Sequence, residues 1–91
     1  MKTFAAVIDV GPDFVERRQP HREAHLARMQ RLREEGKVVM GGAWADPADG
    51  ALVIYRAENL AEARRLVEED PYFLAGLWPE VRLREWSVVI Q

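Results

Sequence analysis

Glu69-Asp70-Pro71-Tyr72-Phe73 is the stretch at which a charged helical pattern ends and the chain turns toward its last strand. Proline fixes its own φ, lacks an N–H group and disfavours helical geometry in the residue before it, so we expect the helix to end at about Asp70. A carboxylate at the C-terminal end of a helix is mildly destabilising unless a cation or a hydrogen-bond donor meets it. Asp70 is therefore predicted to have a specific partner elsewhere in the fold.

The segments on either side of this stretch predict four strands and two helices. Apolar runs bounded by turn residues predict strands, and capping signals with helical periodicity predict helices. The predicted strands span residues 3–10, 38–44, 51–57 and 81–90, and the predicted helices span residues 20–35 and 59–70. Pro20 suits a first helical turn, Gly36 suits a helix C-terminus, and Asn59 with Glu62 resembles a capping box. Turn residues at 46–50 make the second and third strands a hairpin.

The order strand, helix, strand, strand, helix, strand is the ferredoxin-like pattern. We therefore predict an α+β fold with a four-stranded antiparallel sheet and both helices on one face. A chain of 91 residues is enough for one core and one domain, residues 1–91.

The face of the predicted sheet without helices is apolar. The first and third predicted strands carry apolar residues at both odd and even positions, such as Ala5 and Val7 beside Phe4, or Leu52 beside Val53. A sheet with one solvated face alternates apolar and polar residues instead. An apolar patch of this size is unusual on a soluble monomer. The sequence therefore predicts a homodimer packed sheet to sheet, and leaves a higher oligomer open.

The composition excludes several classes of function. The net charge of −2, from 13 basic and 15 acidic residues, gives no support for nucleic-acid binding. The absence of cysteine excludes disulfides, thiolate metal sites and a cysteine nucleophile. The apolar run near the start of the chain is too short to span a membrane, so we expect no membrane partner and a cytoplasmic location.

Two polar residues fall on the apolar faces of different predicted helices. The helical phase places His25 between Leu32 and Met29, and it places Asp70 on the inward face of the second helix. The strand directions bring the start of the first helix and the end of the second to the same sheet edge. A His25–Asp70 pair is the natural assignment, because a carboxylate on one imidazole nitrogen leaves the other free as a base or acid. The alternative is a structural ion pair that only satisfies a buried histidine.

Other candidate residues surround this predicted pair. Arg22, in the first helical turn, could bind a substrate carboxylate through two hydrogen bonds, or it could be a solvated arginine. Gly41-Gly42 could make room for a ligand or for close helix packing. Trp44 and Tyr72 could line an apolar pocket, although aromatic residues near strand ends are more often core or dimer contacts.

His21 and His25 have the i, i+4 spacing that can hold a metal ion on one helix face. The sequence lacks both an HExxH pattern and cysteine, so the spacing alone is a weak signal. We predict no metal site and no cofactor.

The segments Arg22-Glu23-Ala24-His25-Leu26, Gly36, Gly41-Gly42 and Asp70-Pro71-Tyr72, followed by Ala75-Gly76, resemble the YciI-like (YCII-related) family over nearly the whole chain. The resemblance implies a dimeric α+β barrel of ferredoxin-like subunits. It also implies an active site on a histidine and an aspartate, matched here by His25 and Asp70. Some relatives act in dehydrochlorination or isomerisation steps of aromatic breakdown, which implies a small aromatic or dicarboxylic substrate.

The leading hypothesis is a small cofactor-free enzyme of lyase, hydrolase or isomerase type. In it, His25, oriented by Asp70, moves a proton on a small organic acid or phenol, and Arg22 holds an anionic group. The alternative is a non-catalytic small-ligand-binding or accessory module with the same pocket. A third hypothesis is purely structural association through the sheet face.

Overall fold

The structure is a computed structural model that describes residues 1–91. Its elements are β1 (Lys2–Asp9), α1 (Phe14–Arg17), α2 (Gln19–Glu34), β2 (Val38–Ala43), β3 (Gly50–Ala57), α3 (Leu60–Glu68), α4 (Pro71–Leu74) and β4 (Glu80–Glu85). Without the two four-residue helices, this is the predicted order of strands and helices. None of the helices combines the length and the apolar composition needed to cross a membrane.

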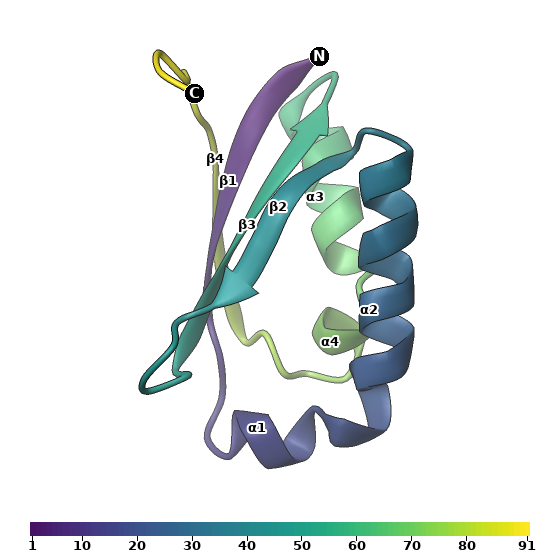
Figure 1. Ribbon diagram of the computed structural model, residues 1–91, viewed down its shortest axis with the longest axis vertical. Coiled ribbons are helices and arrows are strands. Elements are labelled where there is room, and N and C mark those ends of the chain that lie inside the picture. The colour runs from purple at the N-terminus through teal and green to yellow at the C-terminus, as the bar shows by residue number, and fades with distance from the viewer.

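The four strands form one antiparallel sheet in the order β2-β3-β1-β4. The longer helices α2 and α3 lie on the same side of this sheet, and α1 closes one end (Figure 1). The register places Phe4 opposite Tyr55 and Ile8 opposite Val81. The predicted α+β fold, with its four-stranded antiparallel sheet, is confirmed.

The core lies between the sheet and the helices. Alternate residues of β1 and β3 point to this side, because successive side chains of a strand point to opposite faces. The largest fully buried side chains are Tyr55, Phe4, Ile8, Val67 and Asp70. Asp70 is the only charged residue among them, so the fold has to supply it with hydrogen-bond donors.

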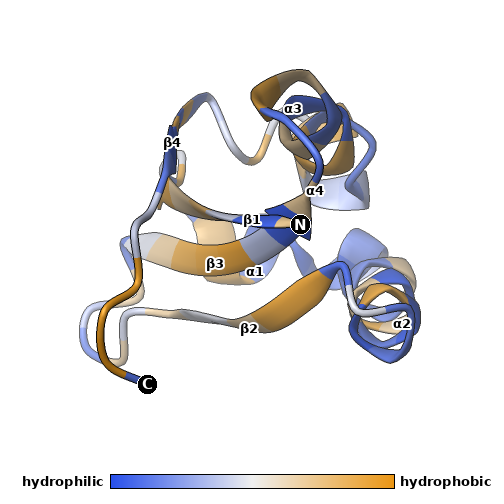
Figure 2. Ribbon diagram, turned by 90° about the horizontal axis from the view of Figure 1, so that it is seen from above, coloured by the Kyte–Doolittle hydropathy of each residue, from blue (hydrophilic) through white to orange (hydrophobic).

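The opposite face of the sheet has no helix over it (Figure 2). Ala5 and Val7 of β1 and Leu52 of β3 lie on this face and are half-buried. On β4, Arg84 pairs with Ala5 and Arg82 pairs with Val7, so the β4 side of the face is charged. The centre of this face is apolar, as the sequence predicted.

The helix boundaries around Asp70 differ from the prediction. Helix α3 ends at Glu68, and Asp70 has an extended backbone, φ −71° and ψ 135°. Pro71 then begins the short helix α4, with Asp70 as its N-cap residue. The interpretation of Asp70 as an unfavourable charge at a helix C-terminus was therefore wrong. The residue sits at a helix N-terminus, where a carboxylate is favourable.

The last strand is shorter than predicted. Strand β4 ends at Glu85, although the Trp86 N–H still donates to the Thr3 carbonyl at 2.8 Å. The next residues have almost no partner left, because β1 begins at Lys2. Residues 87–91 leave the sheet on the side away from the helices, with Val89 87% and Ile90 89% exposed (Figures 1 and 2).

Candidate functional site

Asp70 is fully buried and accepts hydrogen bonds from three residues. His25 Nδ1 lies 2.8 Å from Oδ1 and 3.0 Å from Oδ2. The backbone N–H of Tyr72 donates to Oδ1 at 2.8 Å, and Arg28 Nη1 donates to Oδ2 at 3.5 Å. Both carboxylate oxygens are therefore satisfied by donors from α2 and from the first turn of α4.

The geometry around Asp70 fixes the His25 ring. An ionised carboxylate only accepts hydrogen bonds, so Nδ1 carries the proton and neutral His25 has its lone pair on Nε2. The ring stacks on Tyr72, with centroids 3.8 Å apart and an interplanar angle of 10°. It also meets Trp78 edge to face at 5.8 Å. The predicted His25–Asp70 contact is present, at a hydrogen-bonding distance of 2.8 Å.

Arg28 is a partner of Asp70 that the sequence reasoning missed. Its Nη2 donates to the Leu66 carbonyl at 2.9 Å, and its side chain is only 10% exposed. The same guanidinium therefore joins α2 to the last turn of α3 and to Asp70. Glu69 is more distant, 3.9 Å from Nη2, and its side chain is 68% exposed.

Arg28 lies on the inward face of α2. It is buried together with Leu32, whereas Leu26 on the same helix is 49% exposed. Arg28 lies three residues after His25 and four before Leu32, so helical spacing alone could have found it.

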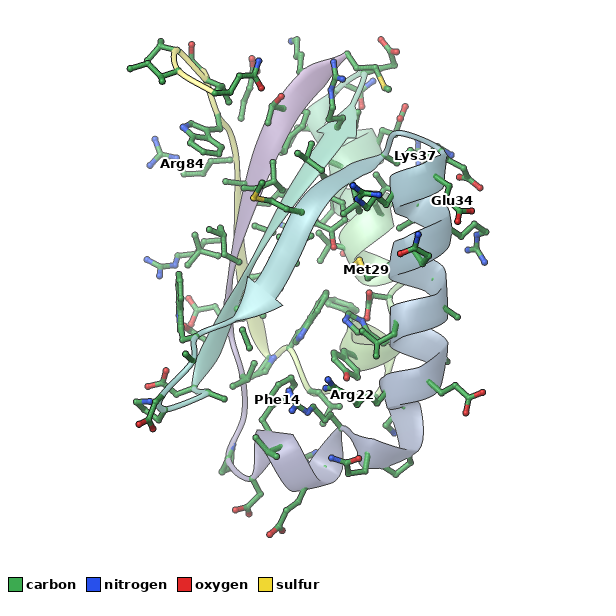
Figure 3. The ribbon with its side chains drawn as sticks, in the orientation of Figure 1. Phe14, Arg22, Met29, Glu34, Lys37 and Arg84 are labelled. Carbon is green, nitrogen blue, oxygen red and sulfur yellow. The ribbon has the colours of Figure 1, made fainter.

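An open cleft of about 660 Å³ lies between α2 and the strands β2 and β3. All five residues predicted to bind a substrate line it, namely Arg22, Gly41, Gly42, Trp44 and Tyr72. His25 also lines the cleft, and Asp70 does not. Arg22, Phe14 and Met29 point into the space between α2 and the sheet (Figure 3). His25 and the five residues predicted to bind a ligand therefore share one cavity, and Asp70 reaches it only through its contact with His25.

The glycines of the cleft have different surroundings. A Cβ at Gly42 would meet nothing within 4 Å, whereas a Cβ at Gly41 would lie a tight 3.2 Å from Val53. The glycine that makes room is Gly50 at the start of β3, because its Cβ would lie 2.7 Å from Trp44 Nε1. Gly50 thus lets the Trp44 indole lie directly against the start of β3.

Several buried polar atoms have no hydrogen-bond partner. They are Arg18 Nε, Tyr55 OH, Tyr72 OH and Trp78 Nε1. Burial raises the pKa of the Tyr72 hydroxyl, although the nearby guanidiniums of Arg22 and Arg18 act against this shift. Burial, together with the negative charge of Asp70, also raises the pKa of Tyr55. Both hydroxyls therefore keep their protons at neutral pH and can donate hydrogen bonds.

The structure does not bring three histidine, cysteine or carboxylate side chains together as a metal site. His21 does not line the cleft, and Nδ1 of His25 is occupied by Asp70. The arrangement offers an imidazole ring that lines the cleft, with its Nδ1 held by a buried carboxylate and its Nε2 not engaged by Asp70. Such a group can take up or release a proton.

The chain matches the YCII-related domain over residues 2–87. Protein YciI of Escherichia coli O6:H1 is 34% identical over 86 residues, which cover 85% of this chain and 88% of that protein. The solved structure of 5-chloro-2-hydroxyhydroquinone dehydrochlorinase (TftG) from Burkholderia phenoliruptrix AC1100, in complex with 2,5-dihydroxybenzoquinone, matches with a TM-score of 0.80. That match has 26% identity and covers 93% of each chain.

Protein Atu4242 from Agrobacterium tumefaciens is a more distant structural neighbour. It matches with a TM-score of 0.57 at 11% identity, covering 98% of this chain and 94% of that one, which shows a shared fold. The family match extends over nearly the whole chain, and the sequence identity to YciI agrees with it. The chain therefore belongs to the YCII-related domain family.

Proposed function

We propose that this protein is a small enzyme that carries out general acid–base chemistry on a small organic molecule bound beside His25. The observation that carries the proposal is the orientation of His25. Asp70 holds Nδ1, and the ring forms part of the wall of the cleft. Asp70 acts through His25 as a positioning residue.

The proposed reaction begins with a proton transfer to Nε2 of His25 from an O–H or C–H group of the ligand. The imidazolium that forms lies beside the Asp70 carboxylate, which stabilises its charge. Return of the proton to another ligand atom completes an isomerisation. Loss of an anionic leaving group, with the proton passed to solvent, completes an elimination. Proton transfer of this kind needs no cofactor.

The similarity to TftG supports a hydroxylated aromatic substrate. That protein is named for the loss of hydrogen chloride from a hydroxylated ring, and its structure holds 2,5-dihydroxybenzoquinone. A dehydrochlorination removes one proton and one chloride, so it uses the kind of proton transfer proposed for His25. The substrate of this chain need not be chlorinated for the same proton transfer to apply.

The proposal can be tested with a panel of hydroxylated benzenes, chlorinated hydroquinones and small carboxylic acids. Each compound would be incubated with the protein in D₂O and followed by NMR. We expect at least one to be converted, or to exchange a C–H proton, faster than in buffer alone.

The second candidate function is a non-catalytic module that binds a small ligand in the same cleft. It would be favoured if a panel compound raised the melting temperature while no compound reacted or exchanged. The proposal of an enzyme would then be wrong.

We also propose that two copies pack through the open faces of their sheets. The apolar centre of this face, which includes Val7 and Leu52, supports the proposal. So does the exposed tail with Val89 and Ile90, which leaves the sheet on the side away from the helices. This arrangement would bury an apolar surface that the helices do not cover.

Sedimentation at micromolar concentration is expected to give twice the chain mass of 10.5 kDa. Leu52→Lys should produce a monomer. In a symmetric dimer each copy contributes this lysine, so two unpaired charges would be buried in the interface. The cost is about 3 kcal/mol or more, which weakens dimer affinity roughly a hundredfold. Leu74→Lys is the matched control, because Leu74 is 73% exposed on α4 and lies off the sheet. A monomeric wild type would contradict the proposed dimer.

A further inference from the structure

The charges that line the cleft all have the same sign. The residues of the cleft include Arg18, Arg22 and Arg33, and no aspartate or glutamate. The whole chain, in contrast, has a net charge of −2. The cleft is therefore a positive region on an acidic protein, and its field favours an anion.

The arginines of the cleft have no carboxylate partner. Other cations of the chain do, such as Arg31, which lies 3.9 Å from Glu35, and Arg28, which contacts Asp70. No aspartate or glutamate forms an ion pair with Arg18 or Arg22. Arg18 Nε is also buried without an acceptor, although the guanidinium packs over Phe14 at 5.2 Å. A buried donor without an acceptor is costly, and a ligand oxygen would satisfy it.

Two further donors without acceptors belong to aromatic residues of the same cleft. The Tyr72 hydroxyl and Trp78 Nε1 are buried without partners, and both residues are only 3% exposed. Arg18, Arg22 and Tyr72 all line this one cleft. The cleft thus has several donors, and they lack acceptors.

The remaining lining suits a flat, apolar ring. Thirteen of the 20 lining residues are hydrophobic. They include Trp44, Trp78 and Tyr72, and the Tyr72 ring already stacks on His25. Aromatic faces of this kind stack favourably against a planar ligand. Figure 3 shows Arg22 pointing into this space from α2.

We propose that the cleft binds a planar aromatic oxyanion, with its ring against the aromatic lining and its charged oxygens on Arg18, Arg22 and the Tyr72 hydroxyl. The inference rests on the proposed function only in taking the cleft beside His25 as the ligand site. To the aromatic substrate proposed above it adds a negative charge and the residues that hold this charge. It also assigns Arg18, which lies between the first strand and the first helix predicted from the sequence, to ligand binding.

Matched pairs of probes test the charge of the ligand. Benzoate is compared with neutral benzamide, and 2,5-dihydroxybenzoquinone, whose enolic hydroxyls ionise in neutral buffer, is compared with neutral hydroquinone. Dissociation constants are measured by NMR titration of the full chain. We expect each anion to bind at least tenfold more tightly than its neutral partner. Tighter binding of benzoate than of the quinone would identify a carboxylate as the charged group that the cleft prefers. Tighter binding of the quinone would identify an enolate or phenolate.

Substitutions test which arginines hold the anion. Arg22→Met and Arg18→Met are each expected to weaken anion binding by about ten- to a hundredfold, the range for a hydrogen bond to a charged group. Arg22→Lys should weaken it less, because it keeps the charge. Arg31→Met is the matched control on the same helix, where the side chain is 62% exposed and pairs with Glu35. It should bind as the wild type does.

The inference is overturned if neutral and charged probes bind equally, or if Arg22→Met and Arg18→Met bind the anions as tightly as Arg31→Met does. These outcomes can be separated from failure of the proposed function. If turnover depends on His25 and the arginine substitutions have no effect, only the proposal that the cleft binds an oxyanion is refuted. If anion binding depends on the arginines and no compound is turned over, only the proposal that the protein is an enzyme is refuted.

Discussion

Asp70→Ala is expected to lower the free energy of unfolding by about 3 to 5 kcal/mol, the usual cost of breaking a buried ion pair. The substitution would leave the Arg28 guanidinium buried beside Leu66 without its charged partner. It would also remove the N-cap acceptor of the Tyr72 N–H, which contributes about 1 kcal/mol. A domain of this size should then melt roughly 12 to 40 °C lower, as measured by circular dichroism.

Two further variants separate the causes of this loss. Glu69→Ala is the neighbouring control, because its carboxylate is exposed and 3.9 Å from Arg28, so we expect a change within about 0.5 kcal/mol. Asp70→Asn keeps an oxygen that can cap α4 but removes the charge. Its free energy of unfolding should lie between those of the wild type and Asp70→Ala. A stability of Asp70→Ala within about 1 kcal/mol of the wild type would contradict the structural role of this carboxylate.

His25→Asn is expected to lower kcat/KM by about 10² to 10⁴ for any substrate that the panel identifies. The variant keeps a polar side chain that can meet Asp70 but removes the nitrogen that exchanges a proton with the ligand. Steady-state kinetics of the wild type and the variant measure the effect. Binding of the anionic probes should change much less than the rate does, since the arginines remain.

His21→Asn is the matched control for this experiment. His21 lies one turn earlier on α2 and does not line the cleft, so its substitution should leave turnover within about twofold of the wild type. Full activity of His25→Asn would contradict the proposed acid–base role of His25, even if Asp70 proved important for stability.

The element order could be predicted because local signals agree with the tertiary structure. Gly36 has a positive φ of 76° where the first helix was expected to end. The Asn59 side chain caps α3 by accepting from the Glu62 N–H at 2.9 Å. The helices α1 and α4 were missed because each has four residues, too few to show helical periodicity.

The contact between His25 and Asp70 was predicted from a partly mistaken premise. Asp70 is not at the end of a helix but at the start of the next, where its charge is favourable. The contact nevertheless forms, because strand direction and helical phase bring both residues to the same edge of the sheet. The same reasoning could not find Arg18. This residue is a candidate for ligand binding only because it lines the cleft that α1 and α2 form with the sheet, and the sequence does not show that cleft. The catalytic role of the pair stays a prediction.

The central claim is that Asp70 holds the proton of His25 on Nδ1, so that Nε2 is free toward the cleft. Two-bond ¹H–¹⁵N correlation spectra distinguish the two neutral tautomers of histidine without any substrate. At a pH where the rings are neutral, we expect His25 to carry its proton on Nδ1 in the wild type and to lose this preference in Asp70→Asn. His21 is the internal reference. A wild-type His25 with its proton on Nε2 would contradict the account.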